Sequence, residues 1–141
     1  EGEYTLPIGV AEVKREGKDV TIVSFGKIIK EAYKAADELA KENISCEIID
    51  LRTVRPMDHK TIIESVKKTN RLVILEEAWP FGNVSTEITY QVQSQAFDYL
   101  DAPIEKINTA DTPAPYSPVL LKEWLPNSND VVKAVHKVLY K

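Results

Sequence analysis

The feature that most constrains the fold of this chain is a repeated alternation of short apolar runs with amphipathic stripes. The run Val20–Phe25 is rich in β-branched residues and almost wholly apolar, which is typical of a strand buried on both faces. The segment Lys27–Asn43 then places aliphatic and small residues at spacings of three and four, which indicates a helix with one buried side. Segments of these two kinds in this order predict βαβ units with right-handed crossovers.

The same alternation continues along the rest of the chain. The further expected strands are Ser45–Leu51, Arg71–Glu76 and Ile104–Asn108. The further expected helices are His59–Thr69 with Asp58 as its cap, a helical pattern from Val84 to Leu100, and a final helix capped by Asn127 or Ser128. The proline-rich segment Thr109–Asn127 is predicted to be a loop.

The start of the chain is expected to differ from the rest. Tyr4–Val13 looks extended, but Pro7 and Gly9 restrict it to an edge strand or a hairpin arm that runs antiparallel to its neighbours. The predicted fold class is therefore α/β, with three α/β/α layers around a mixed, mostly parallel five-stranded sheet whose first strand is antiparallel.

Composition excludes several classes of protein. A chain of 141 residues is one domain, and its formal net charge of −4 argues against a nucleic-acid binder with a basic face. A single cysteine, Cys46, cannot form an internal disulfide. No run of residues approaches the length of an apolar membrane span.

Few residues suggest catalysis. Cys46 falls in an apolar strand as an inert hydrophobe, and His59 and His136 are expected on solvent-exposed helix faces, so neither a nucleophile nor a metal site is predicted. The glycines have no phosphate-loop spacing. Glu76 and Glu77 follow a central strand and could serve acid–base chemistry, but a structural or interface role is equally supported. We therefore expect no catalytic, cofactor-binding or metal-binding residue.

An acidic stretch suggests a docking surface instead. From Phe97 to Asp130 the chain has six acidic and two basic residues, a net charge of −4, with interleaved aromatic residues. Such a surface suits a basic protein partner, although an ordinary solvated loop has the same composition.

Several motifs together resemble a known family. The segment Ile49–Asp58 resembles the D-L-R-T-x-x-P-x-D motif of the transketolase C-terminal domain, and Asp19–Gly26 looks like the first central strand of that domain. Glu76–Gly82 resembles an E-x-x-W-P-x-F-G stretch but lacks one residue before Phe81. With Leu100–Pro103 and Ala110–Tyr116, these segments resemble the β subunits of thiamine-diphosphate-dependent pyruvate dehydrogenases, along essentially the whole chain.

The resemblance implies a domain organisation. Residues 1–13 would be the tail of an interdomain linker and an edge strand, and residues 14–141 would be a transketolase C-terminal-like domain. Nothing in the chain matches the pyrimidine-binding domain that precedes it in the family. In the full heterotetramer the cofactor would be thiamine diphosphate with magnesium; this chain alone is expected to bind none and to be inactive. The compartment would be the bacterial cytoplasm or the mitochondrial matrix.

The resemblance also implies partners. These are the α subunit, a second β subunit, and the basic peripheral-subunit-binding domain of the dihydrolipoyl acyltransferase core, with no nucleic acid and no membrane. Asp101 and the terminal carboxylate of Lys141 would dock that basic domain. Trp79, Pro80 and Phe81 form an aromatic loop that is costly to leave exposed, so we expect it in a subunit contact or a contact with the missing domain.

Three alternatives remain open from the sequence. The parent could act on branched-chain 2-oxoacids or acetoin rather than pyruvate. The chain could be a stand-alone interaction module that uses the same acidic surface. It could also be a flavodoxin-like binder of a small ligand, with its site at the strand ends near Ser24–Gly26 and Glu76–Glu77.

Overall fold

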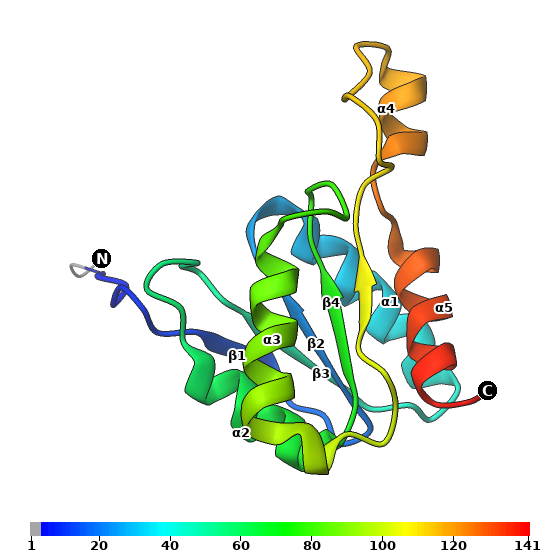
Figure 1. Cartoon of the computed structure of the whole chain (residues 1–141). Helices are drawn as coiled ribbons and strands as arrows, with labels where there is room; N and C mark the ends of the chain where they lie inside the picture. Colours follow the sequence, from blue (N-terminus) through cyan, green and yellow to red (C-terminus); the bar gives the residue numbers. More distant parts are fainter. Residues whose placement is uncertain (1–3) are drawn as a thin grey trace.

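The protein, described here by a computed structural model over residues 4–141, is built around one mixed sheet. The five strands are β1 (Glu12–Arg15), β2 (Val20–Ser24), β3 (Cys46–Asp50), β4 (Leu72–Leu75) and β5 (Glu105–Ile107). They lie in the order β1-β3-β2-β4-β5, and only β1 is antiparallel to its neighbour. This confirms the predicted three-layer α/β fold, in which helices cover both faces of the sheet (Figure 1).

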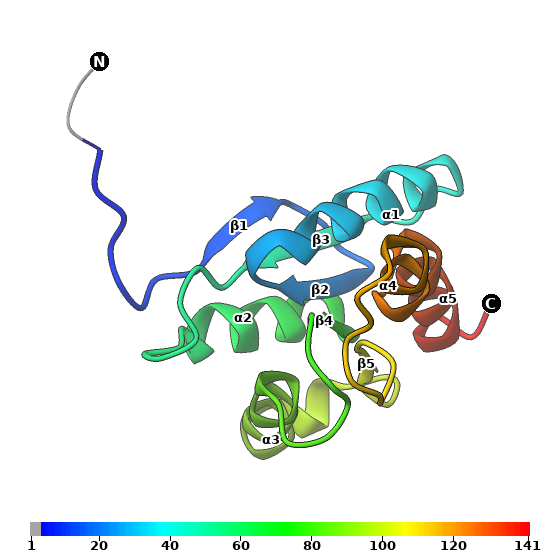
Figure 2. The same cartoon turned by 90° about the horizontal axis from the view of Figure 1, so that it is seen from above.

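Two pairs of helices cover the sheet, one on each face. Figure 2 shows α1 (Ile29–Lys41) and α5 (Ser128–Val138) on one side and α2 (His59–Thr69) and α3 (Val84–Ala96) on the other. Each pair packs on its own apolar cluster, and β2, β3 and β4 contribute to both clusters. The three central strands are buried on both faces as their apolar sequences predict. Within residues 4–141, none of the helices has the length and apolar character that a transmembrane span requires.

The first strand does not form a hairpin with the second. β1 pairs antiparallel with β3 at the edge of the sheet, so the hairpin alternative is wrong and the antiparallel edge strand is confirmed. Its predicted bounds, Tyr4–Val13, are wrong, because the strand spans only Glu12–Arg15 and residues 4–11 form no strand. The turn before β2 crosses close to β3, where a Cβ atom on Gly17 would lie 2.1 Å from the backbone nitrogen of Glu47. Only glycine allows this approach. It places β2 on the inner side of β3 rather than beside β1.

Two short helical elements were not expected. A 3₁₀ turn, η1 (Gly26–Ile28), precedes α1, and another, η2 (Phe97–Tyr99), ends the helical pattern after α3. The segment Thr109–Asn127, which the sequence predicts as a loop, contains the helix α4 (Pro118–Trp124). Proline occupies the first turn of α4, a position that needs no backbone N–H. We call residues 109–127 the arm; it projects beyond the carboxyl ends of the parallel strands (Figure 1).

A buried carboxylate joins the sheet to α2. Glu47 on β3 is 1% exposed and accepts hydrogen bonds from the Ser65 hydroxyl (2.5 Å) and the Gly17 backbone N–H (3.2 Å). It also forms an ion pair with Lys68. Burial opposes ionisation of Glu47, but the hydrogen bonds from Lys68, Ser65 and Gly17 outweigh burial and hold its pKa below the ordinary value. The charged form is thus the one that the fold accommodates.

Asp58 caps α2 and also holds the start of the chain. Its carboxylate accepts bonds from the Thr61 backbone N–H (3.1 Å), the Thr61 hydroxyl (2.7 Å) and the Ala11 backbone N–H (3.0 Å). Burial raises the pKa of Asp58, but these bonds from Thr61 and Ala11 lower it by more, so the net pKa lies below the ordinary value. One side chain therefore fixes both α2 and the segment that leads into β1.

Replacing Asp58 by alanine is expected to lower the free energy of unfolding by about 1–3 kcal/mol, since a helix cap and a tertiary hydrogen bond are both lost. A carboxyl whose pKa is lowered by folding stabilises above its unfolded pKa of about 3.9. The difference between the two proteins should therefore shrink as the pH falls below about 4. Urea unfolding followed by circular dichroism measures this difference in the free energy of unfolding. Asp111→Ala, at an exposed position in the arm, is the control.

Candidate docking and interface surfaces

The predicted docking residue Asp101 lies at a corner where three elements end. Its backbone N–H donates to the carbonyl of Asn70 (2.9 Å), and the Asn70 side chain donates to the carbonyl of Tyr99 (2.8 Å). Asn70 follows α2 with a φ of +62°, in the left-handed region that often ends a helix. The segment after η2 is thereby tied to the end of α2, and the Asp101 side chain projects outward with 56% of its surface exposed.

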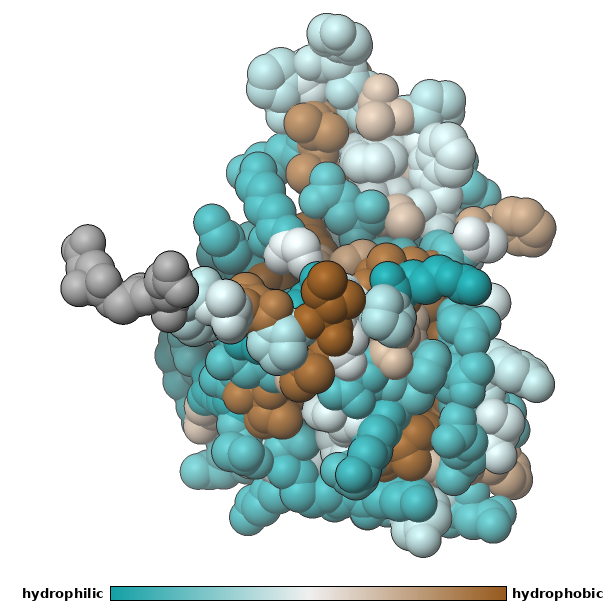
Figure 3. Space-filling view, turned by 90° about the vertical axis from the view of Figure 1, so that its left-hand side faces the viewer, coloured by the Kyte–Doolittle hydropathy of each residue, from teal (hydrophilic) through white to brown (hydrophobic). Residues whose placement is uncertain are grey.

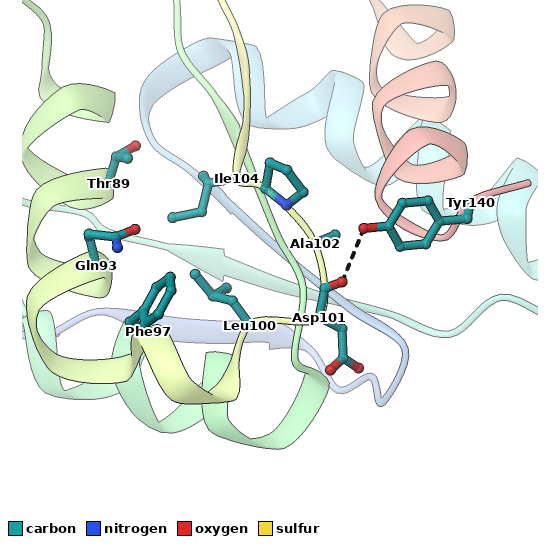
Figure 4. Close-up of a pocket in the computed structure, with 9 residues that line it drawn as sticks. Thr89, Gln93, Phe97, Leu100, Asp101, Ala102, Ile104 and Tyr140 are labelled. Carbon is teal, nitrogen blue, oxygen red and sulfur yellow. Dashed lines mark hydrogen bonds between the residues drawn. The ribbon is translucent and has the colours of Figure 1, made fainter.

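The same corner receives the end of the chain. Tyr140 donates its hydroxyl proton to the carbonyl of Asp101 (3.2 Å), the contact drawn in Figure 4. Arg71 contacts the Asp101 carboxylate (Nη2 to Oδ2, 3.4 Å) and also donates to the carbonyl of Val138 at the end of α5 (3.1 Å). Lys141, the other predicted docking residue, is exposed and follows Tyr140 directly. Residues some forty positions apart in sequence thus share one surface.

An apolar pocket adjoins this corner. It has a volume of about 460 Å³ and lies between α3 and the segment Leu100–Ile104. Phe97, Leu100 and Ile104 line it on one side, and Tyr140 stands on the other (Figure 4). Phe97 is 59% exposed and Tyr140 is 72% exposed. Asp101 thus lies beside exposed aromatic side chains, a combination frequent at protein interfaces.

The acidic stretch does not form one continuous surface. Asp98 and Asp101 lie at the end of the domain where η2 closes α3, whereas Asp111 and Glu123 belong to the arm at the opposite end (Figure 1). Glu105 forms an ion pair with Lys137 (2.8 Å). The acidic residues of this stretch are thus divided between the two ends of the domain, and Asp101 lies beside Tyr140 at the end of the chain.

The predicted interface residues Trp79, Pro80 and Phe81 form an exposed loop after β4. Trp79 is 53% exposed and Phe81 is 89% exposed. The loop contacts the arm, since the indole N–H groups of Trp79 and Trp124 both donate to the carbonyl of Thr112 (2.9 and 2.8 Å). Exposed side chains of the arm, Tyr116, Val119 and Leu120, extend the apolar surface beyond this junction. We give the name loop–arm surface to the set Trp79, Phe81, Thr112, Tyr116, Val119 and Leu120.

A second exposed apolar surface lies on the side of β1. Leu6, Ile8 and Val10 of the extended N-terminal segment are exposed, as is Val54 in the loop before α2. The Thr53 hydroxyl joins the two segments by accepting from the Gly9 backbone N–H (2.9 Å). Figure 3 shows hydrophobic side chains gathered in the middle of this face.

Glu76 has a structural position rather than a catalytic one. It is 3% exposed, and its two carboxylate oxygens accept from the backbone N–H groups of Val84 (3.1 Å) and Ser85 (2.9 Å) at the start of α3. The Glu76 side chain thus satisfies two of the first backbone N–H groups of α3, which have no partner within the helix. Glu77, by contrast, is exposed.

Replacing Glu76 by glutamine is expected to lower the free energy of unfolding by about 1.5–3 kcal/mol. The isosteric amide turns an N–H group toward one of the two backbone donors and removes the charge. Thermal or urea unfolding measures the loss. Glu77→Gln, at the exposed neighbouring position, should change stability by less than about 0.5 kcal/mol, and equal effects of the two variants would contradict the capping role of Glu76.

The other residues considered for chemistry offer no catalytic group. Cys46 is buried, and burial raises the pKa of its thiol to about 12, so the inert interpretation is supported. His59 is half-buried rather than exposed as predicted, because α2 begins beneath the loop that holds Pro56. His136 contacts Glu42 at 2.8 Å. Among residues 4–141, no three His, Cys, Asp or Glu side chains lie where they could hold a metal ion.

Comparison with known proteins identifies the family. Residues 9–131 match the family described as transketolase, C-terminal domain. The chain belongs to this family. A solved structure supports the assignment: a chain titled "Split gene transketolase, inactive beta4 tetramer" superimposes with a TM-score of 0.84 and 28% identity, over 98% of this chain and 44% of that chain.

Curated relatives of this transketolase C-terminal domain share one name. "Pyruvate dehydrogenase E1 component subunit beta" of Rhizobium meliloti (strain 1021) is 56% identical over 99% of this chain and 30% of that protein. The protein of the same name from Rickettsia felis is 53% identical over 96% of this chain and 41% of that protein. The mitochondrial protein of this name from Dictyostelium discoideum is 50% identical over 96% of this chain and 38% of that protein. The chain thus spans less than half the length of these relatives.

Sequence reasoning missed three parts of these surfaces. Arg71 and Tyr140, which hold Asp101, have no sequence signal because their contacts depend on where α2 and α5 end. The helix α4 did have a sequence signal, since Ser117-Pro118 is followed by residues that favour helices. The capping by Glu76 could have been inferred from a carboxylate that precedes a helix start by a short loop.

Proposed function

We propose that this chain serves as the C-terminal domain of the β subunit of a thiamine-diphosphate-dependent pyruvate dehydrogenase. That enzyme decarboxylates pyruvate oxidatively and transfers the acetyl group to lipoyl groups. The observation that carries the proposal is identity of 50–56% across nearly the whole chain to subunits of that name. In this role the domain contributes subunit assembly and docking of the acyltransferase core, and no catalytic side chain.

The proposal assigns the cofactor chemistry to other parts of the enzyme. Thiamine diphosphate needs a magnesium site and donors for its phosphates, and residues 4–141 offer neither a metal-binding cluster nor a glycine-rich phosphate loop. Residues 4–141 therefore do not provide the groups that would hold this cofactor. Thiamine diphosphate with magnesium would be bound in the complete heterotetramer. The compartment would be the cytoplasm in bacteria and the mitochondrial matrix in eukaryotes.

The loop–arm surface is proposed as a contact with another subunit, the α subunit or a second β subunit. Trp79 and Phe81 are large and exposed, and the hydrogen bond from Trp79 to Thr112 holds its indole against the arm, so the apolar area of Trp79 is available at little cost in conformational entropy. An exposed apolar patch of this kind on a single chain usually marks an interaction site.

Hydrogen exchange should be slower at this surface in the assembled enzyme. We expect the amides of residues 78–83 and 116–121 to be protected by at least tenfold in the heterotetramer relative to the 141-residue chain, because the subunit contact excludes water and limits local opening. The amides around Lys60 on the exposed side of α2 serve as the internal control. Free exchange of the loop in the heterotetramer would remove it from the interface.

Asp101 and the terminal carboxylate of Lys141 are proposed to dock the basic peripheral-subunit-binding domain. The Asp101 carboxylate is 56% exposed, so it can attract a basic partner and then exchange its contact with Arg71 for one with that partner. Phe97 and Tyr140, which are exposed beside Asp101, would add apolar contacts to the same partner. The ammonium group of Lys141 opposes docking and would weaken it by local repulsion.

Replacing Asp101 by asparagine should weaken binding of the assembled heterotetramer to the basic domain by about tenfold or more at low salt, equivalent to about 1.4 kcal/mol. The loss should be smaller at high salt, where charges are screened. Surface plasmon resonance at two salt concentrations measures it. Asp98→Asn removes the same charge from a nearby exposed position and is the control. Unchanged affinity of the Asp101 variant at low salt would exclude it from the docking site.

A further inference from the structure

We propose that the crevice at the carboxyl ends of β2 and β4 binds a small organic anion with an apolar body, a role beyond assembly and docking. The position follows from the topology. The chain leaves β2 through α1 on one face of the sheet and leaves β4 through α3 on the opposite face. Figure 2 shows these two helices on opposite sides of neighbouring strands. Such a divergence opens a crevice, and open α/β sheets bind ligands there.

A cavity occupies this position. It has a volume of about 380 Å³, within the range of sites for small organic molecules, and lies between the first turn of α1 and the base of the arm. Glu77, just after β4, lies at its edge. The apolar part of its lining comes from Ile28, Leu121, Leu125 and Pro126. Ile28 and Pro126 are buried, and the two leucines are half-buried.

The charged part of the lining is basic in a chain whose net charge is −4. Lys27, Lys30 and Lys122 line the cavity, are exposed, and form no ion pair within residues 4–141. They face one free carboxylate, that of Glu77. The excess of cations at the mouth of an apolar cavity attracts an anion and raises its local concentration.

The remaining charges of the lining are already paired. Lys34 contacts Glu31 at 2.6 Å, and the second carboxylate oxygen of Glu31 accepts from the backbone N–H of Ser128 at 3.1 Å. Glu31 thereby joins α1 to the start of α5 and fixes one wall of the cavity. It is not available to neutralise Lys27 or Lys30.

Both halves of the lining define the ligand. Lysine ammonium groups on flexible stems select negative charge but not a fixed geometry. The aliphatic floor favours a ligand with a ring or short chain that covers it and displaces water. An inorganic anion would leave this floor wet, and a neutral apolar molecule would leave the lysines unused. An organic anion contacts both the lysine ammonium groups and the aliphatic part of the lining.

The probe for the test is 8-anilino-1-naphthalenesulfonate, added to the ¹⁵N-labelled 141-residue chain and followed by NMR. We expect saturable chemical-shift changes at the amides of residues 27–30 and 121–128. N-phenyl-1-naphthylamine has the same rings without the sulfonate, and pyrophosphate has the charge without the rings. Each should bind at least fivefold more weakly than the sulfonate.

Variants separate this cavity from other apolar surfaces. The combined change Lys27→Gln, Lys30→Gln and Lys122→Gln should weaken sulfonate binding at least fivefold. The control, Lys18→Gln, Lys60→Gln and Lys133→Gln, removes the same charge from exposed positions outside the cavity and should leave binding unchanged. Leu121→Ser should weaken binding without changing the charge.

Three outcomes would overturn the proposal. They are equal binding by the two triple variants, shift changes confined to the loop–arm surface, and equal binding of the neutral naphthylamine. Shift changes at residues 121–128 on addition of a partner subunit, with no response to the sulfonate, would assign the crevice to a protein contact instead. None of these outcomes bears on docking through Asp101.

Discussion

The arrangement of functional surfaces at the carboxyl end of the sheet depends on the buried carboxylate of Glu76. Both of its oxygens are used to hold the first backbone N–H groups of α3, and its own backbone N–H donates to the carbonyl of Ile107 (3.0 Å). The chain between β4 and α3 must therefore leave the sheet and return over a short distance. Its large side chains, those of Trp79 and Phe81, are exposed, and Trp79 contacts the arm. The buried Glu76 side chain thus fixes the start of α3, where the loop that carries Trp79 and Phe81 ends.

The two ends of the sheet carry different surfaces. At the amino ends of β4 and β5, the ends of α2 and α5 and the turn η2 form the Asp101 corner. At the carboxyl ends lie the loop–arm surface and the crevice between α1 and the arm. A partner held at one end does not obstruct the other. This separation is what a domain needs if it contacts neighbouring subunits and a docking partner at the same time.

Much of the fold could be predicted from the sequence because its signals are local. Apolar runs such as Leu72–Leu75 and the cap Asp58 identify strands and a helix start without tertiary information. The pairing of β1 with β3 could not be predicted, because a one-turn hairpin with β2 is compatible with the same local sequence and the choice depends on tertiary contacts such as the close approach of Gly17 to β3. The predicted docking residues came from a family resemblance, and the predicted interface residues Trp79, Pro80 and Phe81 came from the cost of leaving an aromatic loop exposed. Their contacts with Arg71, Tyr140 and Thr112 join distant segments and have no local signal.

The single carbonyl of Thr112 that accepts from two indoles has a consequence for spectroscopy. Trp79 and Trp124 are the two tryptophans of the chain, and both belong to the junction between the loop and the arm rather than to either apolar core. Indole emission therefore senses the attachment of the arm, while far-ultraviolet circular dichroism senses the helices around the sheet. A noncoincidence of the two signals during unfolding would mean that the arm detaches before the domain melts, and would not by itself imply an intermediate of the core.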